Sequence, residues 1–197
     1  MSVNFWSGLF WDFFIILIYL LLFLFRNKIS NKFKSNKNLE KWWNGLKDSC
    51  KIRYNNIYTS ILLPIVLVLI YWLVILSITN SSFVHYTGFY ELFSSVFLAP
   101  FSEEVIFRGI LLGLFVIFSF DYFTVSTKFI GFKKYRLPVI LFGLLIISLF
   151  FSLQHAGKID LRYLGGLLFG ILYLVDKRNL LPAMIGHFVN NVIAFLI

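Results

Sequence analysis

The chain is short of charge and has almost no cysteine. Its 197 residues include one cysteine, Cys50, and 14% charged residues, whereas soluble domains average about 25% charged residues. A single cysteine excludes an internal disulfide and a Cys-x-x-Cys metal site. The low charge, with 59% hydrophobic residues and a mean hydropathy of +0.84, excludes an ordinary soluble domain. The composition therefore predicts a polytopic membrane protein.

Acidic residues are also few, and the formal net charge is +9. Of the 18 Lys and Arg, 15 fall in three polar segments between apolar runs, at 26–53, 128–136 and 177–178. Cytoplasmic loops carry an excess of Lys and Arg, so we expect these segments in the cytoplasm, in contact with anionic lipid headgroups. This explanation of the charge leaves no reason to expect a nucleic-acid partner.

Six apolar runs predict an all-α transmembrane helical bundle of about six spans in the cell membrane, since a bilayer core needs about 20 helical residues. The runs cover 5–25, 57–78, 89–118, 137–154, 161–175 and 180–197. We divide the chain into an N-terminal part with two spans and a basic loop, 1–88, and a core, 89–197. Within the basic loop, Trp42-Trp43 among lysines predicts an interfacial helix, and Asp12 in the first run is expected near the outer interface.

A carboxylate doublet with a basic partner stands in the third run. Charged side chains at membrane depth are costly unless they are paired or used. Glu104 and Arg108 are four residues apart, share one helix face and are predicted to form an ion pair. Glu103 points about 100° away around the helix and has no partner on it, so its carboxylate is a candidate general base. The alternative is a structural ion pair with a second Glu at a water-filled edge.

Two histidines and an asparagine stand in other apolar runs. His155 ends the fourth run, one turn after Phe151, and on its own would be an ordinary interfacial residue. His187 and Asn191 are one turn apart in the sixth run and project to the same side. Two hydrogen-bond donors on one side fit an oxyanion-stabilising pair. They could equally bind a metal together with Glu103 and His155, or simply join two helices.

These patterns, in this order, resemble the CAAX-protease and bacteriocin-processing family of intramembrane proteases, also called the type II CAAX prenyl endopeptidase-like or Abi family. The family carries Glu-Glu-x-x-x-Arg, Phe-x-x-x-His and His-x-x-x-Asn or Asp. In this chain the three patterns begin at Glu103, Phe151 and His187. Each pattern alone is weak, but three in order, each in an apolar segment, are specific. The resemblance covers roughly residues 89–197, so the first two spans look like a variable addition.

The resemblance implies a site formed between membrane helices and a role for each residue. Glu103 would activate water for attack on a peptide carbonyl, and His155 would help to hold that water. His187 and Asn191 would stabilise the oxyanion.

Two further residues, Glu104 and Arg108, would support the helix that carries the general base. The family has been described both as zinc-type metalloproteases and as metal-independent, glutamate-dependent proteases. A divalent metal such as zinc therefore stays open as a cofactor, with Glu103, His155 and His187 as its candidate ligands.

The function implied is an intramembrane endopeptidase that cuts a membrane-anchored or lipidated, CAAX-type protein or peptide, such as a bacteriocin precursor. Two other classes stay open. A non-enzymatic membrane immunity or scaffold protein, as in bacteriocin self-immunity, would keep its function in a Glu103→Gln variant. A small transporter or proton relay would use the same buried groups for ion-coupled flux without cleavage.

Overall fold

The computed structural model describes residues 3–78, 89–122, 136–156 and 160–196. The described residues are almost entirely helical, with one isolated bridge, between Lys51 and Asn179, in place of any sheet. The all-α prediction is confirmed. The elements, with η for π-helical segments, are α1 (Val3–Phe33), α2 (Lys37–Ser49), η1 (Tyr58–Leu62), α3 (Leu63–Ile78), α4 (Phe89–Phe93), η2 (Ser94–Leu98), α5 (Ala99–Glu104), η3 (Val105–Leu112), α6 (Gly113–Tyr122), α7 (Arg136–Ala156), α8 (Arg162–Val175) and α9 (Leu180–Leu196).

Three helical segments are long and apolar enough to cross a membrane by length and composition: Phe10–Phe33, Tyr58–Ile78 and Leu137–His155. α8 and α9 are apolar but shorter. The second, fourth, fifth and sixth predicted runs therefore coincide with helices to within a few residues. The chain is a helical membrane bundle, and the count of about six spans stays a prediction. The predicted loops at 79–88 and 128–136 lie almost wholly outside the described residues.

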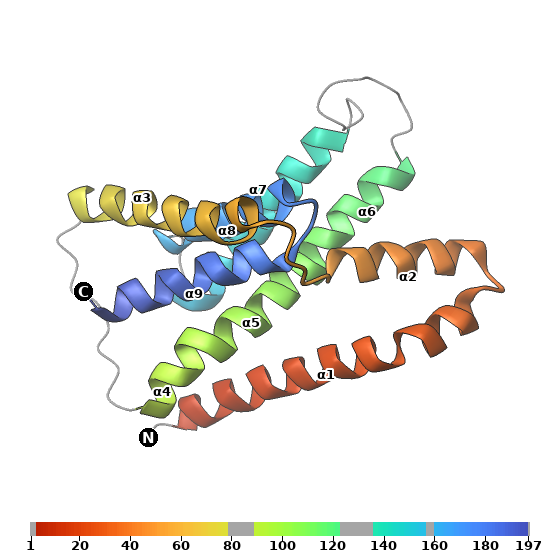
Figure 1. The fold of residues 1–197 in the computed structure, drawn as a ribbon, viewed down its shortest axis with the longest axis horizontal. Coiled ribbons are helices and arrows are strands. Elements are labelled where there is room, and N and C mark those ends of the chain that lie inside the picture. The colour runs from red at the N-terminus through yellow and green to blue at the C-terminus, as the bar shows by residue number, and fades with distance from the viewer. Residues whose placement is uncertain (1–2, 79–88, 123–135, 157–159, 197) are drawn as a thin grey trace.

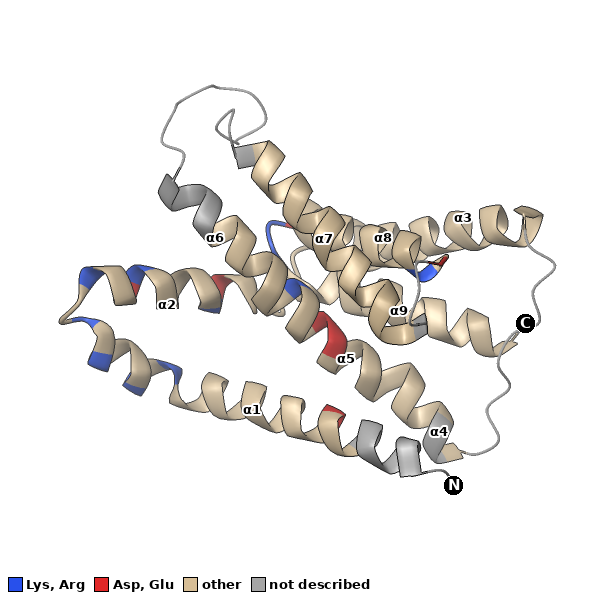
Figure 2. Ribbon diagram, turned by 180° about the vertical axis from the view of Figure 1, so that it is seen from behind, with Lys and Arg blue, Asp and Glu red and all other residues tan. Residues whose placement is uncertain are grey.

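The basic segment 26–53 is largely helical. The helix predicted around Trp42-Trp43 is present as α2, and its place at the membrane interface stays a prediction, whereas the prediction of a loop is wrong for residues 26–33, which continue α1. α1 continues without a break to Phe33, because Lys and Arg are good helix formers and the apolar run does not end in a helix-breaking residue. α2 then starts at an Asn36 N-cap, whose side chain accepts hydrogen bonds from the backbone N–H groups of Asn38 and Leu39. Figure 2 shows the Lys and Arg gathered on the end of α1 and on α2.

Three helices and two π-helical segments, from α4 to α6, form one continuous column that crosses the bundle diagonally (Figure 1). Proline lacks a backbone N–H and its ring displaces the carbonyl four residues earlier, which breaks the regular α-helical ladder. η2 ends two residues before Pro100, and η1 ends two residues before Pro64. η3 begins directly after Glu104, so the carboxylate pair lies where the helix changes its winding.

Small residues allow α7 and α8 to pack closely. A Cβ added to Gly166 would lie 3.2 Å from the backbone Cα of Ser148, and one added to Gly170 would lie 2.2 Å from a methyl carbon of Leu144. These glycines therefore permit a close approach of the two helices. This contact holds the end of α7, with its histidine, against the start of α8.

A cluster of polar side chains joins the turn between α8 and α9 to the segment between α2 and α3. Asp176 accepts hydrogen bonds from Asn55 and Thr59, and from Asn179 at 2.6 Å. The Asn179 side chain also bonds both backbone groups of Arg53. The segment between α2 and α3 is thereby fixed to the α8–α9 turn, which places α3 beside α9.

Candidate active site

Helices that are far apart in sequence enclose a cavity of about 480 Å³. Its wall combines the column, the end of α7, the start of α8, the face of α9 and two aromatic residues of α3. The lining residues are Tyr71, Trp72, Ile75, Ser95, Ala99, Glu103, Phe151, His155, Asp160, Leu161, Arg162, Gly165, Phe169, His187, Asn190, Asn191 and Ala194. The four residues predicted as catalytic are all in this wall.

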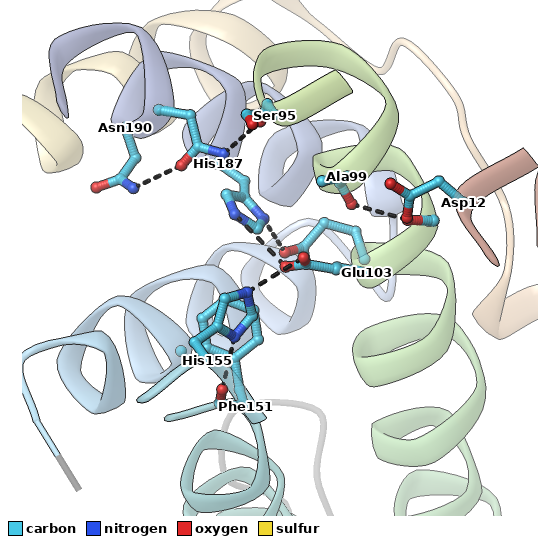
Figure 3. A network of polar contacts seen from close by, with 12 residues as sticks. Asp12, Ser95, Ala99, Glu103, Phe151, His155, His187 and Asn190 are labelled. Carbon is cyan, nitrogen blue, oxygen red and sulfur yellow. Dashed lines mark hydrogen bonds and ion pairs between the residues drawn. The ribbon is translucent and has the colours of Figure 1, made fainter. Parts of the chain in front are cut away.

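Glu103 contacts the first predicted histidine. Glu103 Oε1 lies 3.2 Å from His155 Nε2, and His155 Nδ1 lies 2.8 Å from the carbonyl oxygen of Phe151 (Figure 3). A carbonyl only accepts, so Nδ1 must carry a proton. His155 and Glu103 then share one further proton, as a neutral pair or as an imidazolium and a carboxylate. Glu103 has no partner on its own helix, as predicted. Its partner is His155 of α7.

The second oxygen of Glu103 has a different environment. Glu103 Oε2 is buried and has no hydrogen-bond partner among the described residues. It lies 3.7 Å from His187 Nε2, too far for a direct hydrogen bond. A buried oxygen without a partner is unusual and calls for an explanation, such as a bound water or a catalytic role. Glu103 itself lines a cavity whose wall also contains two imidazole rings.

The predicted ion pair between Glu104 and Arg108 is present and fully buried. Arg108 Nη1 donates to Glu104 Oε1 at 3.0 Å, and Arg108 Nη2 donates to the carbonyl oxygen of Gly166 at 2.9 Å. Glu104 Oε1 also lies 2.9 Å from His187 Nδ1. Since a carboxylate accepts, Nδ1 carries the proton and Nε2 is turned toward Glu103. Glu104 therefore does more than support its own helix, because it fixes the orientation of His187.

Aromatic rings hold the imidazoles and the guanidinium in place. Phe151 lies 4.5 Å from the His155 ring, and Phe169 stacks on the His187 ring at 4.6 Å, between centroids. The Arg108 guanidinium lies 4.7 Å from the centre of the Phe151 ring, close enough for a cation–π contact. Phe151, the Phe of the Phe-x-x-x-His pattern, therefore contacts both imidazole rings and the Arg108 guanidinium.

A chain of amide hydrogen bonds orients Asn191. Its Nδ2 donates to the carbonyl oxygen of Ser95 at 2.7 Å, and its Oδ1 accepts from Asn190 Nδ2 at 3.0 Å. Asn190 Oδ1 in turn accepts from Trp72 Nε1 at 3.1 Å. Asn190 therefore lies in the same cavity wall as His187 and Asn191. Asn190 is three residues after His187, and that spacing also brings two side chains to one side of a helix.

Asp12 lies beside the site and has a partner on another helix. It accepts a hydrogen bond of 2.5 Å from Ser102, the residue before Glu103. This contact joins α1 to α5 on the side of the column away from the cavity (Figure 3). The sequence around Asp12 could not predict this contact, because Ser102 is 90 residues away.

The three candidate metal ligands converge but already contact one another. In the described part of the chain, no group of three or more His, Cys, Asp or Glu is arranged to hold a metal ion. His155 Nε2 and Glu103 Oε1 lie at hydrogen-bond distance from each other in this arrangement. We therefore derive no step through a metal, and metal dependence is a matter for experiment.

Apolar helices around a polar cavity, with a carboxylate between two imidazoles, define a helical membrane protein with a buried carboxylate–histidine site. The sequence model of the family described as type II CAAX prenyl endopeptidase Rce1-like matches residues 85–193, more than half of the chain, and the chain belongs to this family. At the level of the family it is a CAAX-type intramembrane protease. Comparison with curated proteins and with solved structures finds no match.

Proposed function

We propose that the protein is an intramembrane endopeptidase in which Glu103 activates the attacking water. The observation that carries the proposal is the asymmetry of this carboxylate. One oxygen is paired with His155, while the other is buried and has no hydrogen-bond partner among the described residues. A general base needs such an accepting atom within reach of its proton donor.

The proposed reaction uses groups that the cavity already presents. Glu103 Oε2 takes a proton from water as the water oxygen attacks the peptide carbonyl carbon. The carbonyl oxygen becomes an oxyanion, for which the second Nδ2 hydrogen of Asn191 and Nε2 of His187 are the nearest donors. Donation from His187 Nε2 requires the imidazolium form, because Nδ1 already donates to Glu104. The proton on Glu103 then passes to the leaving amine as the carbon–nitrogen bond breaks.

The proposed substrate is a membrane-anchored or lipidated, CAAX-type protein or peptide. The family supports this substrate class, and the apolar surface of the bundle is consistent with it, because side chains such as Leu73 and Phe142 are more than half exposed. A substrate already in the bilayer would reach a cavity between helices without crossing bulk water. Anionic lipid headgroups are the proposed partners of the basic residues on α1 and α2. The excess of Lys and Arg there supports a cytoplasmic position for that end of the bundle.

The test compares membranes from cells that express the wild type or Glu103→Gln, with new protein termini mapped by mass spectrometry. We expect termini that appear only with the wild type, and a loss of at least about 100-fold in their rate of formation in the variant. Glu40→Gln, the same chemical change on α2 and outside the cavity, should behave as the wild type. Treating the same membranes with a chelator then reports metal dependence.

Equal termini from the wild type and an equally abundant, folded Glu103→Gln protein would contradict the proposal. If the wild type still gave its cellular phenotype under those conditions, a membrane immunity or scaffold role would replace the enzyme. A phenotype that persists in Glu103→Gln would point the same way.

A further inference from the structure

A carboxylate of the first helix contacts the residue next to the general base. Asp12 belongs to α1, where none of the residues from Phe10 to Phe33 is fully buried in the bundle. Its Oδ1 accepts a hydrogen bond from Ser102 Oγ at 2.5 Å, and Ser102 is only 1% exposed. An ionisable side chain on a helix in the membrane is costly unless it is paired or used. The proposed reaction gives Asp12 no task, so this contact calls for an explanation.

The short helix that carries Glu103 depends on contacts with its neighbours. α5 has six residues and lies between the π-helical segments η2 and η3. Hydrogen bonds in a π-helix join residues five apart instead of four, so the regular α-helical winding of α5 does not continue into either neighbouring segment. The rotation of α5 about its own axis is therefore set by the side chains that it places against other helices.

Four successive residues of α5 make such contacts, and the first two face α1. Phe101 packs edge-on against Tyr19 of α1, with ring centroids 5.5 Å apart. Ser102 contacts Asp12 of the same helix (Figure 3). The next two residues are the carboxylate pair, which contacts the histidines of α7 and α9. A rotation of α5 away from α1 would therefore also move both carboxylates relative to the imidazole rings.

We infer that Asp12 is a positioning residue: through Ser102 it holds α5 in the rotation that places Glu103 against the imidazole of α7. The inference rests on the proposed function, because it concerns the general base of that reaction. Positioning matters there, since a displacement of about 1 Å can remove most of the effect of a catalytic group. Asp12 lies outside residues 85–193, which the family model matches, so the site includes a contact from beyond the matched part of the chain.

Two substitutions separate this hydrogen bond from the docking of α1. Asp12→Asn keeps an oxygen that accepts from Ser102, whereas Asp12→Leu removes it and leaves a side chain that suits a membrane helix. Asp12→Leu should therefore unfold in sodium dodecyl sulfate at the wild-type midpoint or above it. Ser30→Ala is the matched control, because Ser30 accepts hydrogen bonds from Trp43 and Lys47 of α2 near the other end of α1.

The first measurement does not depend on cleavage. The chain has three histidines, so the full-length protein is labelled with nitrogen-isotope histidine, purified in detergent and studied by NMR, with the His155 signal assigned by its loss in His155→Gln. His155 Nε2 lies 3.2 Å from Glu103 Oε1, so its chemical shift reports the position of the general base. We expect this signal to move in Asp12→Leu and in Ser102→Ala, and to stay in place in Asp12→Asn and Ser30→Ala.

The second measurement is the cleavage of a fluorogenic, S-farnesylated CAAX-type peptide by the same preparations. We expect Asp12→Leu to lower kcat about tenfold with KM unchanged, the effect of one lost hydrogen bond to a charged group. Ser102→Ala should give the same loss. The double variant should lose no more than either single variant, because both changes remove one contact. Asp12→Asn should restore most of kcat, and Ser30→Ala should keep all of it.

Several results would overturn the inference. These are a wild-type His155 signal in Asp12→Leu, losses of kcat that add up in the double variant, and an Asp12→Asn loss as large as that of Asp12→Leu. A lower unfolding midpoint in Asp12→Leu would show a merely structural role and would overturn it too. Failure of the proposed function would appear separately, as no cleavage by the wild type, and the His155 signal alone would then decide whether Asp12 positions Glu103.

Discussion

Substitutions in the buried ion pair at the centre of the site should change stability and activity independently. Glu104 and Arg108 have side chains that are 0% and 1% exposed, and their charged atoms are 3.0 Å apart. Glu104→Gln keeps the shape of the side chain but leaves the Arg108 charge without a counter-charge in a poorly solvated site. Removing one partner of such a pair costs about 3–5 kcal/mol. We expect that loss in the free energy of unfolding.

A double variant tests whether the charge is the cause. Glu104→Gln with Arg108→Met removes both charges, and replacing a buried ion pair by uncharged groups of similar volume is often neutral. We expect the double variant to recover the free energy of unfolding to within about 1–2 kcal/mol of the wild type. Activity should stay low, because His187 Nδ1 no longer faces a carboxylate and Arg108 no longer holds Gly166.

The assay is unfolding by sodium dodecyl sulfate in mixed micelles, with the cleavage rate measured on the same preparations. Asp48→Asn is the matched control, because it removes the ion pair between Asp48 and Lys51. Both of these side chains are nearly half exposed, so the variant should lose at most about 1 kcal/mol of the free energy of unfolding. A double variant that is less stable than Glu104→Gln alone would refute the reasoning, as would a Glu104→Gln loss no larger than that of Asp48→Asn.

Three other substitutions or measurements test single contacts. Trp72→Phe removes the Nε1–H that orients the amide chain, and should lower the cleavage rate about tenfold while the free energy of unfolding changes by no more than about 1.5 kcal/mol. Gly166→Ala, which meets backbone at 3.2 Å, should destabilise by about 1–3 kcal/mol in the same unfolding assay, whereas Gly165→Ala, with 3.5 Å to its nearest neighbour, should be neutral or stabilising. Burial raises the pKa of Cys50 to about 12, so the thiol stays protonated at pH 8, and maleimide should label it rapidly only after denaturation. A wild-type cleavage rate in Trp72→Phe would contradict the role of the Trp72–Asn190 contact. Equal stabilities of the two glycine variants would contradict the close approach at Gly166, and rapid labelling of the folded protein would contradict the burial of Cys50.

The local spacing in the sequence singled out residues that the structure brings together around one cavity. Charge and imidazole are costly in apolar segments, so Glu103, Glu104, His155 and His187 stood out without any structure. The i,i+4 rule was enough to pair Glu104 with Arg108, because both residues are on one helix. The apolar runs likewise fixed most helix positions, since bilayer thickness sets their length.

The partners from other helices were decided only by the tertiary structure. Nothing in the spacing pairs Glu103 with a residue 52 positions later, or places the Glu104 oxygen on the ring nitrogen of His187, 83 positions later. Straight, parallel helices with the predicted boundaries would have kept the two histidines apart. The column crosses the bundle diagonally, and α7, α8 and α9 meet it at an angle, which brings both rings to one carboxylate (Figure 1).

Several residues that line the cavity could not be predicted from the sequence either. Trp72 and Tyr71 belong to the part of the chain regarded as a variable addition, yet they line the site. Arg162 stands near the start of an apolar run, and only the fold shows that it lines the cavity. A sequence pattern records neighbours along one helix, within a turn or two. Which helix faces meet depends on crossing angles, and these are set by side-chain packing over the whole bundle.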